Sequence, residues 1–144
     1  MVKRRMRLGS GIDAQKLRDT IDQVYDSFEE SPQLTLDVHG VDDGWVHLVP
    51  EAGQNDAGEL TQVIGWLLTF GFPYDGEPLP KLAQLGVEVG SGYKLANWEV
   101  GMYVSLWLPD DAAVEEIAEM MIAVVRKVLG VSDDAHVEVA LEFG

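Results

Sequence analysis

The chain contains no cysteine. This absence excludes disulfide cross-links, thiolate metal sites, iron–sulfur clusters and cysteine nucleophiles. A chain of 144 residues must then be held together by its core, and 47% hydrophobic residues are enough to form one. We expect a single domain over residues 12–144 that folds without a metal or a disulfide, in a protein of the cytoplasm.

Long apolar runs are missing too. No run approaches the roughly 18 residues that a membrane-spanning helix needs. The first eight residues are basic, but no apolar stretch follows them, so they do not resemble a secretory signal. We therefore expect no membrane contact.

Basic residues are scarce and unevenly placed: 10 basic residues face 25 acidic ones, for a net charge of −15. The first seven residues contain no acid and hold Lys3, Arg4, Arg5 and Arg7. The acidic remainder would repel phosphate groups, so nucleic-acid binding is not expected. Residues 1–11, which end in Gly9-Ser10-Gly11, are expected to form a flexible basic arm.

Apolar residues at helical spacing predict three helices. The first covers residues 14–29 and has Asp13 as its N-cap. The third begins at a cap provided by Asp110 or Asp111 and ends at Gly130. The second, over residues 56–70, contains two glycines that weaken a helix by about 1 kcal/mol each. Its apolar face would consist of Leu60, Val63, Ile64, Leu67 and Leu68.

Alternating apolar residues predict strands. Residues 33–39 and 45–49 form a hairpin, because residues 40–44 have the composition of a turn. That turn would place His39 opposite Trp45 and Asp37 opposite His47. Residues 71–84 are expected to be irregular. Further strands are expected at residues 85–89, 98–108 and 136–143.

The expected element order is therefore α-β-β-α-β-β-α-β. Hairpins imply a mostly antiparallel sheet. Helices that each have one apolar face must pack that face against the sheet. We predict an α+β fold with a single mostly antiparallel sheet and helices packed mainly on one face.

All three histidines fall on the predicted outer side of this sheet. Asp37, His39 and His47 would suit zinc or iron as ligands. A Ser–His–acid set of Ser105, His47 and Asp37 is also conceivable, although Ser105 lies in mid-strand without a nucleophile elbow. Phosphate-binding and dinucleotide-binding patterns are absent from the sequence, so no cofactor is expected.

Three large rings, Trp45, Tyr103 and Trp107, are also predicted on the outer side. Exposed rings of this size are typical of surfaces that a partner covers. The cover would be a second copy, a peptide, or the chain's own segment 71–84.

The C-terminal part, roughly residues 60–143, resembles a known family. Gly71-Phe72-Pro73, then Asn97-Trp98, then a long helix ending in Val128-Leu129-Gly130-Val131 are similar to the TY-Chap domains, which belong with the YbjN and type III secretion chaperone-like superfamily. The resemblance implies a small α+β protein that pairs into dimers and binds peptides or partner proteins without catalysis. It assigns a role to no single residue here.

Together these observations favour a non-enzymatic protein- or peptide-binding module, chaperone-like or adaptor in character, homodimeric, and directed at a basic partner. Its contacts would come from Trp45, Tyr103 and Trp107. One alternative is a small metal-binding protein or enzyme that uses Asp37, His39 and His47. The other is an immunity or inhibitor protein for a basic partner.

Overall fold

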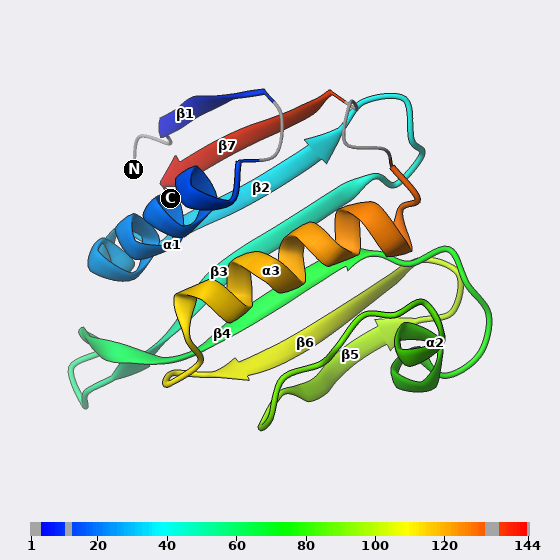
Figure 1. The fold of residues 1–144 in the computed structure, drawn as a ribbon. Helices are drawn as coiled ribbons and strands as arrows, with labels where there is room; N and C mark the ends of the chain where they lie inside the picture. The colour runs from blue at the N-terminus through cyan, green and yellow to red at the C-terminus, as the bar shows by residue number, and fades with distance from the viewer. Residues whose placement is uncertain (1–3, 11–12, 132–135, 144) are drawn as a thin grey trace.

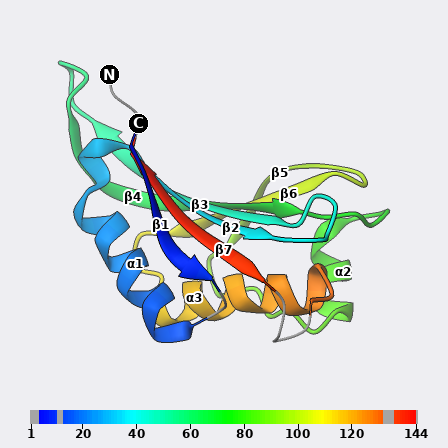
Figure 2. The same cartoon turned by 90° about the horizontal axis from the view of Figure 1, so that it is seen from above.

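The fold consists of one sheet with its helices on a single face (Figure 1, Figure 2). The computed structural model describes residues 4–10, 13–131 and 136–143. Its element order is β1 (Arg4–Ser10), α1 (Ala14–Asp26), η1 (Phe28–Glu30), β2 (Pro32–Val38), β3 (Trp45–Gln54), β4 (Leu60–Gly71), α2 (Pro78–Gln84), β5 (Lys94–Glu99), β6 (Tyr103–Pro109), α3 (Val114–Ala123), η2 (Val124–Val128) and β7 (Val137–Phe143). The α+β class with an antiparallel sheet is thus confirmed.

Within the described residues the sheet has seven strands in the order β1-β7-β2-β3-β4-β6-β5, and every neighbouring pair is antiparallel. β7 lies between β1 and β2 and is therefore an interior strand of the sheet. The edge strands are β1 and β5, and each departs from regular pairing at a bulge. Bulges at edges hinder pairing with a further strand.

Of the flexible arm expected for residues 1–11, the described residues 4–10 form the strand β1, and residues 1–3 and 11 lie outside the described chain. The backbone of β1 pairs with β7 from Arg4↔Phe143 to Ser10↔Glu138. The alternation of apolar and basic residues in this segment is too short to predict a strand. The partner strand lies more than a hundred residues away in sequence, so local reasoning could not find it.

The first helix, α1, begins as expected at Asp13. The Asp13 carboxylate accepts hydrogen bonds from the backbone N–H groups of Gln15, at 3.0 Å, and Lys16, at 3.1 Å. These bonds satisfy N–H groups that have no partner within the helix. Leu17, Ile21 and Val24 are its buried face.

The β2–β3 hairpin is confirmed, but its predicted register was wrong. Asp37 pairs with Trp45, and His47 pairs with Thr35. The reason lies in the connection, where the Val38 N–H donates to the Gly44 carbonyl at 2.7 Å and Asp43 adopts a left-handed φ of 55°. The β2–β3 ladder therefore ends at the pair Asp37↔Trp45, two residues earlier on β2 than predicted, and His39 lies outside it.

The helix predicted for residues 56–70 was wrong, because this segment is β4. Trp66, Leu68 and Phe70 alternate on the buried face, and Leu67 and Thr69 lie on the other. β4 pairs with β3 on one side and β6 on the other. Tertiary pairing of this kind overrides the helical spacing of apolar residues, which a short apolar run satisfies equally well.

The segment between β4 and β5 also differs from prediction. Residues 71–84 are not wholly irregular, since Pro78–Gln84 form α2 with proline in the first turn, where its missing N–H costs nothing. The strand expected at residues 85–89 is absent, because Leu85 caps α2 and the following residues form no ladder in the described chain.

The strand expected over residues 98–108 is in fact a hairpin. β5 ends at Glu99 and β6 begins at Tyr103. The Met102 N–H donates to the Glu99 carbonyl at 3.0 Å, and Gly101 has a φ of 73° that suits glycine. Val100 and Met102 are consequently exposed, rather than buried with Val104 and Leu106.

The last helix is confirmed, but its cap is not. Ala113 occupies the N-cap position without a side-chain hydrogen bond, where Asp110 or Asp111 was predicted. From Val124 to Val128 the helix continues with π geometry, and the Leu129 N–H donates to the Val124 carbonyl at 3.0 Å. No helix of the described residues is long and apolar enough to cross a membrane.

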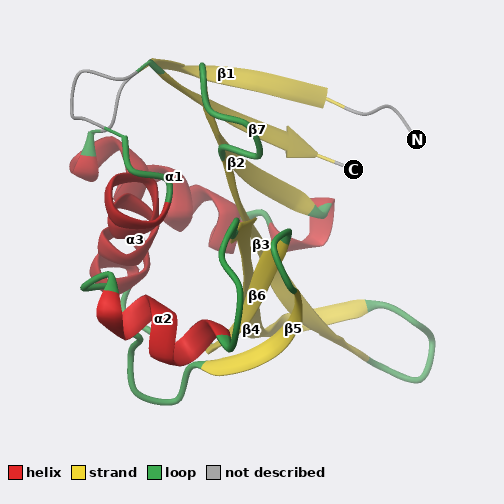
Figure 3. Ribbon diagram, turned by 90° about the vertical axis from the view of Figure 1, so that its right-hand side faces the viewer, coloured by secondary structure: helices red, strands yellow, loops and turns green. Residues whose placement is uncertain are grey.

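The core lies between the helices and the inner face of the sheet (Figure 3). Its largest fully buried side chains include Trp66, Phe70, Phe72, Leu34, Leu36 and Ile117. The apolar face of each helix is therefore buried against the sheet. The opposite face of the sheet has no helix over it among the described residues, and this surface is called the outer face below.

Candidate functional site

The outer face is defined by the strand registers, because residues paired across strands share a face. Three rows of side chains cross it. The upper row contains Glu138, Asp37, Trp45, Tyr103 and Glu99. The middle row contains Ala140, Thr35, His47, Thr69, Ser105 and Asn97. The lower row contains Val49, Leu67, Trp107 and Lys94.

The middle row is a polar strip. The Thr69 and Ser105 hydroxyl oxygens lie 2.9 Å apart and share a hydrogen bond. His47 is opposite Thr69 on the other side, so Thr69 separates His47 from Ser105. With strands about 4.8 Å apart, this places His47 and Ser105 about 10 Å from each other. The strip therefore does not form the Ser–His–acid set that the sequence allowed.

His47 is half-buried within the strip. Burial lowers its pKa below the ordinary value of 6.5, and the nearby carboxylates of Glu142 and Asp37 oppose the shift without reversing it. The imidazole is consequently neutral at neutral pH. A neutral ring can donate one hydrogen bond and accept one.

Trp107 is fixed by three neighbours. Its indole N–H donates to the Glu51 carboxylate at 2.9 Å. Lys94 Nζ lies 5.6 Å from the ring centroid on the adjacent strand. Gly65 provides the space beneath the ring, because a Cβ there would lie 2.6 Å from Trp107 Nε1. The ring is thus held flat on the outer face between an acid and a base.

Trp45 and Tyr103 occupy the upper row. The Tyr103 hydroxyl accepts a hydrogen bond from the Asn97 amide at 2.9 Å, and the Trp45 ring meets His47 edge-on with centroids 6.3 Å apart. Gly71 pairs with Tyr103, and the Asp43 carbonyl fills the place where a Gly71 side chain would stand. All three predicted rings lie on the outer face and are half-buried rather than fully exposed.

Residues 71–84, which were expected as a possible cover, do not cover the rings of Trp45, Tyr103 and Trp107. α2, within residues 71–84, lies on the same side of the sheet as α1 and α3 (Figure 3). The aromatic surface is therefore shaped by contacts within the sheet itself.

His39 is separated from the other two proposed metal ligands. Its Nε2 lies 3.5 Å from a Glu138 carboxylate oxygen, and its ring meets that of His136 edge-on at 4.5 Å. Asp37 pairs with Trp45, and His47 lies two residues further along β3, opposite Thr35. The described residues contain no group of three or more His, Asp or Glu side chains that could hold a metal ion.

Sequence reasoning missed the residues that hold Trp107 in place. Glu51 lies beyond the strand predicted for residues 45–49, Gly65 lies in the helix predicted for residues 56–70, and Lys94 lies outside every predicted strand. The available signal was Gly65 itself, since a glycine within an apolar run often marks a close approach in a strand.

No family model, no curated protein and no solved structure matches the chain. The fold and the outer face therefore carry the functional argument alone.

Proposed function

We propose that the chain is a non-enzymatic protein-binding module, of chaperone-like or adaptor character, whose outer face binds a basic segment of a partner protein. The observation that carries this proposal is the position of Trp45, Tyr103 and Trp107. They lie together on the sheet face that no described helix covers. Aromatic side chains held in place by their neighbours lose little entropy on binding and are typical anchors of interfaces.

Charge supports a basic occupant. The net charge is −15, and Glu51 and Glu99 are exposed beside Trp107 and Tyr103. A cationic segment would meet carboxylates at the rim and indole or phenol faces between them, and both attract cations. An acidic segment would be repelled at the same places.

The proposal is tested by titrating the protein with a synthetic peptide of alternating lysine and leucine, and with its counterpart of alternating glutamate and leucine. We expect the lysine peptide to bind and to shift the indole N–H signals of Trp45 and Trp107 in NMR spectra. Trp107→Ala should weaken binding by at least about fivefold, the size of an interface anchor.

Tyr25→Ala provides the matched control, because Tyr25 is an exposed ring, 45% accessible, on α1 and away from the outer face. Equal binding of both peptides, or equal weakening by both substitutions, would refute the proposal. Sedimentation equilibrium of the same variants separates peptide binding from homodimer formation. If Trp107→Ala abolishes only self-association, the occupant is a second copy and not a basic peptide.

A further inference from the structure

The strand β1 occupies one edge of β7 without matching it closely. On the other edge, β2 pairs with β7 in seven consecutive residue pairs. β1 forms six pairs with β7, and a bulge between Arg7 and Gly9 interrupts its ladder. Because a bulge disrupts the hydrogen bonds around it, β7 can support a more regular partner on this edge than the one that the chain provides.

The mismatch extends to the inner, buried face of the sheet. Three inward-facing residues of β7 pair with β1, and their partners are a glycine, a methionine and an arginine: Gly9↔Val139, Met6↔Leu141 and Arg4↔Phe143. Leu141, opposite the methionine, is fully buried, whereas Val139 and Phe143 keep 8% and 6% of their surface exposed. A strand with apolar side chains at all three positions would bury more apolar surface here than β1 does.

On the outer face the same edge carries charge. Glu138 and Glu142 lie there, and both are half-buried. β1 provides Arg5 opposite Glu142, but the uncharged Ser10 opposite Glu138. Opposite charges directly across an antiparallel pair stabilise it. A strand with basic residues at both positions would therefore match β7 better than β1 does.

The place of β1 depends on β7. Among the described elements, the extensive contacts of β1 are with β7, whereas α1 packs against α3, β2 and β3. α1 also begins at its own N-cap, Asp13, which comes three residues after the end of β1. Release of β1 would therefore leave α1 anchored and β7 paired with β2.

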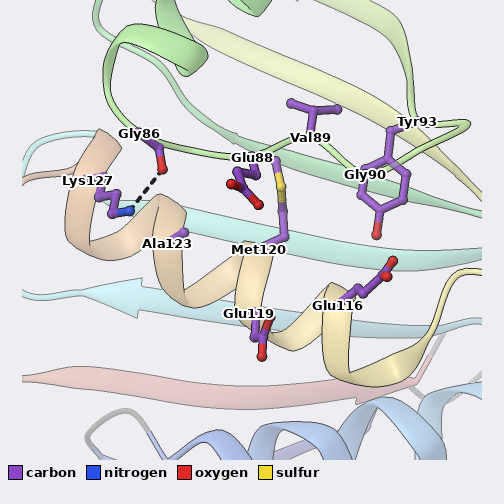
Figure 4. Close-up of a pocket in the computed structure, with 10 residues that line it drawn as sticks. All are labelled: Gly86, Glu88, Val89, Gly90, Tyr93, Glu116, Glu119, Met120, Ala123 and Lys127. Carbon is purple, nitrogen blue, oxygen red and sulfur yellow. Dashed lines mark hydrogen bonds between the residues drawn. The ribbon is translucent and has the colours of Figure 1, made fainter.

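The other edge strand, β5, is anchored more firmly. The Asn97 amide donates to the Tyr103 hydroxyl at 2.9 Å, and the Asn97 side-chain oxygen accepts from the Trp98 N–H at 2.9 Å. The connection that leads into β5 is tied to the last helix by a hydrogen bond from Lys127 Nζ to the Gly86 carbonyl at 2.9 Å, beside a pocket of about 440 Å³ (Figure 4). Replacement of an edge strand is therefore favoured at β1 and not at β5.

We infer that the edge of β7 is a docking site for an extended segment of a partner protein, which displaces β1 and pairs antiparallel with Val137–Phe143. The segment carries basic residues opposite Glu142 and Glu138, and apolar residues at the alternate, inward positions. In strand addition of this kind, backbone hydrogen bonds provide affinity and alternate side chains provide specificity. β1 is a built-in competitor, so the apparent affinity depends on the fraction of molecules from which it is released.

The occupant is a foreign segment and not the β1 strand of a second copy. A second copy's β1 has the same bulge and the same residues, so exchange between two copies would replace one ladder by an equivalent one. The β1 position is three strands away from β3, which carries Trp45, or about 14 Å. The inference therefore does not depend on the function proposed for the three rings of the outer face.

The test uses the full chain and two heptapeptides of identical composition. The matched peptide has lysine at its second and sixth positions, valine at its first, third and fifth, and threonine at its fourth and seventh. The control peptide exchanges the fifth and sixth residues, so in every register one lysine faces inward. We expect the matched peptide to bind at least about tenfold more tightly than the control at about 0.15 M salt.

Hydrogen exchange of the backbone amides, followed by NMR, shows where the peptide binds. We expect amides of β1 that are protected in the free protein to lose their protection when the matched peptide saturates the chain, whereas those of β7 keep it. Shifts of the Trp45 and Trp107 indole signals without release of β1 would place the peptide on the rings. That result would overturn this inference and support the function proposed above.

Two variants test the register. Arg5→Glu places a like charge opposite Glu142, so β1 should compete less and the matched peptide should bind about threefold to fivefold more tightly. Lys16→Glu makes the same change in charge at an exposed position of α1 and should have no such effect. Glu138→Gln should weaken binding by about threefold to fivefold, because the partner of the sixth residue is lost.

The outcomes are distinct. Equal binding of the two peptides, or binding that leaves β1 protected, overturns the inference. An equal effect of Arg5→Glu and Lys16→Glu also overturns it, since attraction would then depend on net charge alone. If neither peptide binds and sedimentation equilibrium shows a dimer that Arg5→Glu dissociates, β1 is exchanged between two copies and the foreign segment is ruled out. Thermal unfolding of each variant separates a change in binding from a loss of folding.

Discussion

Replacement of Gly65 by alanine tests the arrangement of the outer face most directly. Gly65 lacks a side chain beneath the Trp107 ring, and a Cβ would lie 2.6 Å from Nε1 and 2.8 Å from Cε2 and Cζ2. Unstrained contacts of this kind need about 3.5–4.0 Å, so the ring must move away by about 1 Å. The ring cannot move that far and keep its 2.9 Å hydrogen bond to Glu51.

The expected change in the free energy of unfolding is the sum of opposing effects. Loss of the hydrogen bond costs about 0.5–1.5 kcal/mol, and a displaced rotamer costs a similar amount. Alanine offsets about 0.5–1 kcal/mol of this, because it has less entropy than glycine to lose in a strand. Gly65→Ala should therefore destabilise the fold by about 1 kcal/mol, or lower Tm by about 3 °C.

A double-mutant cycle with Trp107→Ala provides the decisive measurement, by urea unfolding followed with circular dichroism. Without the indole ring, Gly65→Ala should be neutral or stabilising. The two positions must then show a coupling energy of about 1 kcal/mol or more. Equal destabilisation by Gly65→Ala in both backgrounds would show that the ring does not depend on the glycine, and the reasoning would be refuted.

Two further predictions concern the same face. Burial lowers the pKa of His47, so the unfolded chain binds a proton at this ring more readily than the folded chain does. The contribution of His47 to the free energy of unfolding is therefore complete above about pH 6.5, and it is lost as the pH falls through the lowered pKa. His47→Gln should reduce the fall in urea midpoint between about pH 7 and pH 5, and an unchanged fall would contradict the burial of this ring. Gly71→Ala should destabilise by about 2–3 kcal/mol in urea unfolding, because its Cβ would collide with the Asp43 carbonyl. Wild-type stability for this variant would contradict the close approach.

Secondary structure could be predicted from the sequence where a local pattern was compatible with only one kind of element. Residues 33–39 and 45–49 alternate strictly around a turn, and the structure has that hairpin. Asp13 precedes a long run at helical spacing, and α1 begins there. The outer position of Trp45 and Trp107 follows from the same alternation, so the central residues of the candidate surface could be found without coordinates.

The failures share a physical cause. Leu60, Val63, Leu67 and Leu68 satisfy helical spacing, yet Trp66, Leu68 and Phe70 also alternate, and only the neighbouring strands decide between them. The left-handed φ at Asp43 changes the register of the β2–β3 hairpin, and the turn at Gly101 divides the alternating residues 98–108 into two strands. Neither feature changes the pattern of apolar residues along the chain. The pocket of Figure 4 joins residues from two segments that no local pattern connects.

The place of β7 has a consequence for how the chain reaches its fold. β2 pairs with β7 from Pro32↔Phe143 to Val38↔Val137, so one edge of the earlier β2–β3 hairpin stays unpaired until residues 137–143 are synthesised. Contacts across such separations form slowly, because the intervening loop must close first. The β3–β4 and β5–β6 hairpins can nucleate locally, whereas closure of β7 into the gap between β1 and β2 is the slow step. A nascent chain of this protein therefore exposes an unpaired strand edge from the synthesis of β2 until that of β7, and that interval carries an aggregation risk.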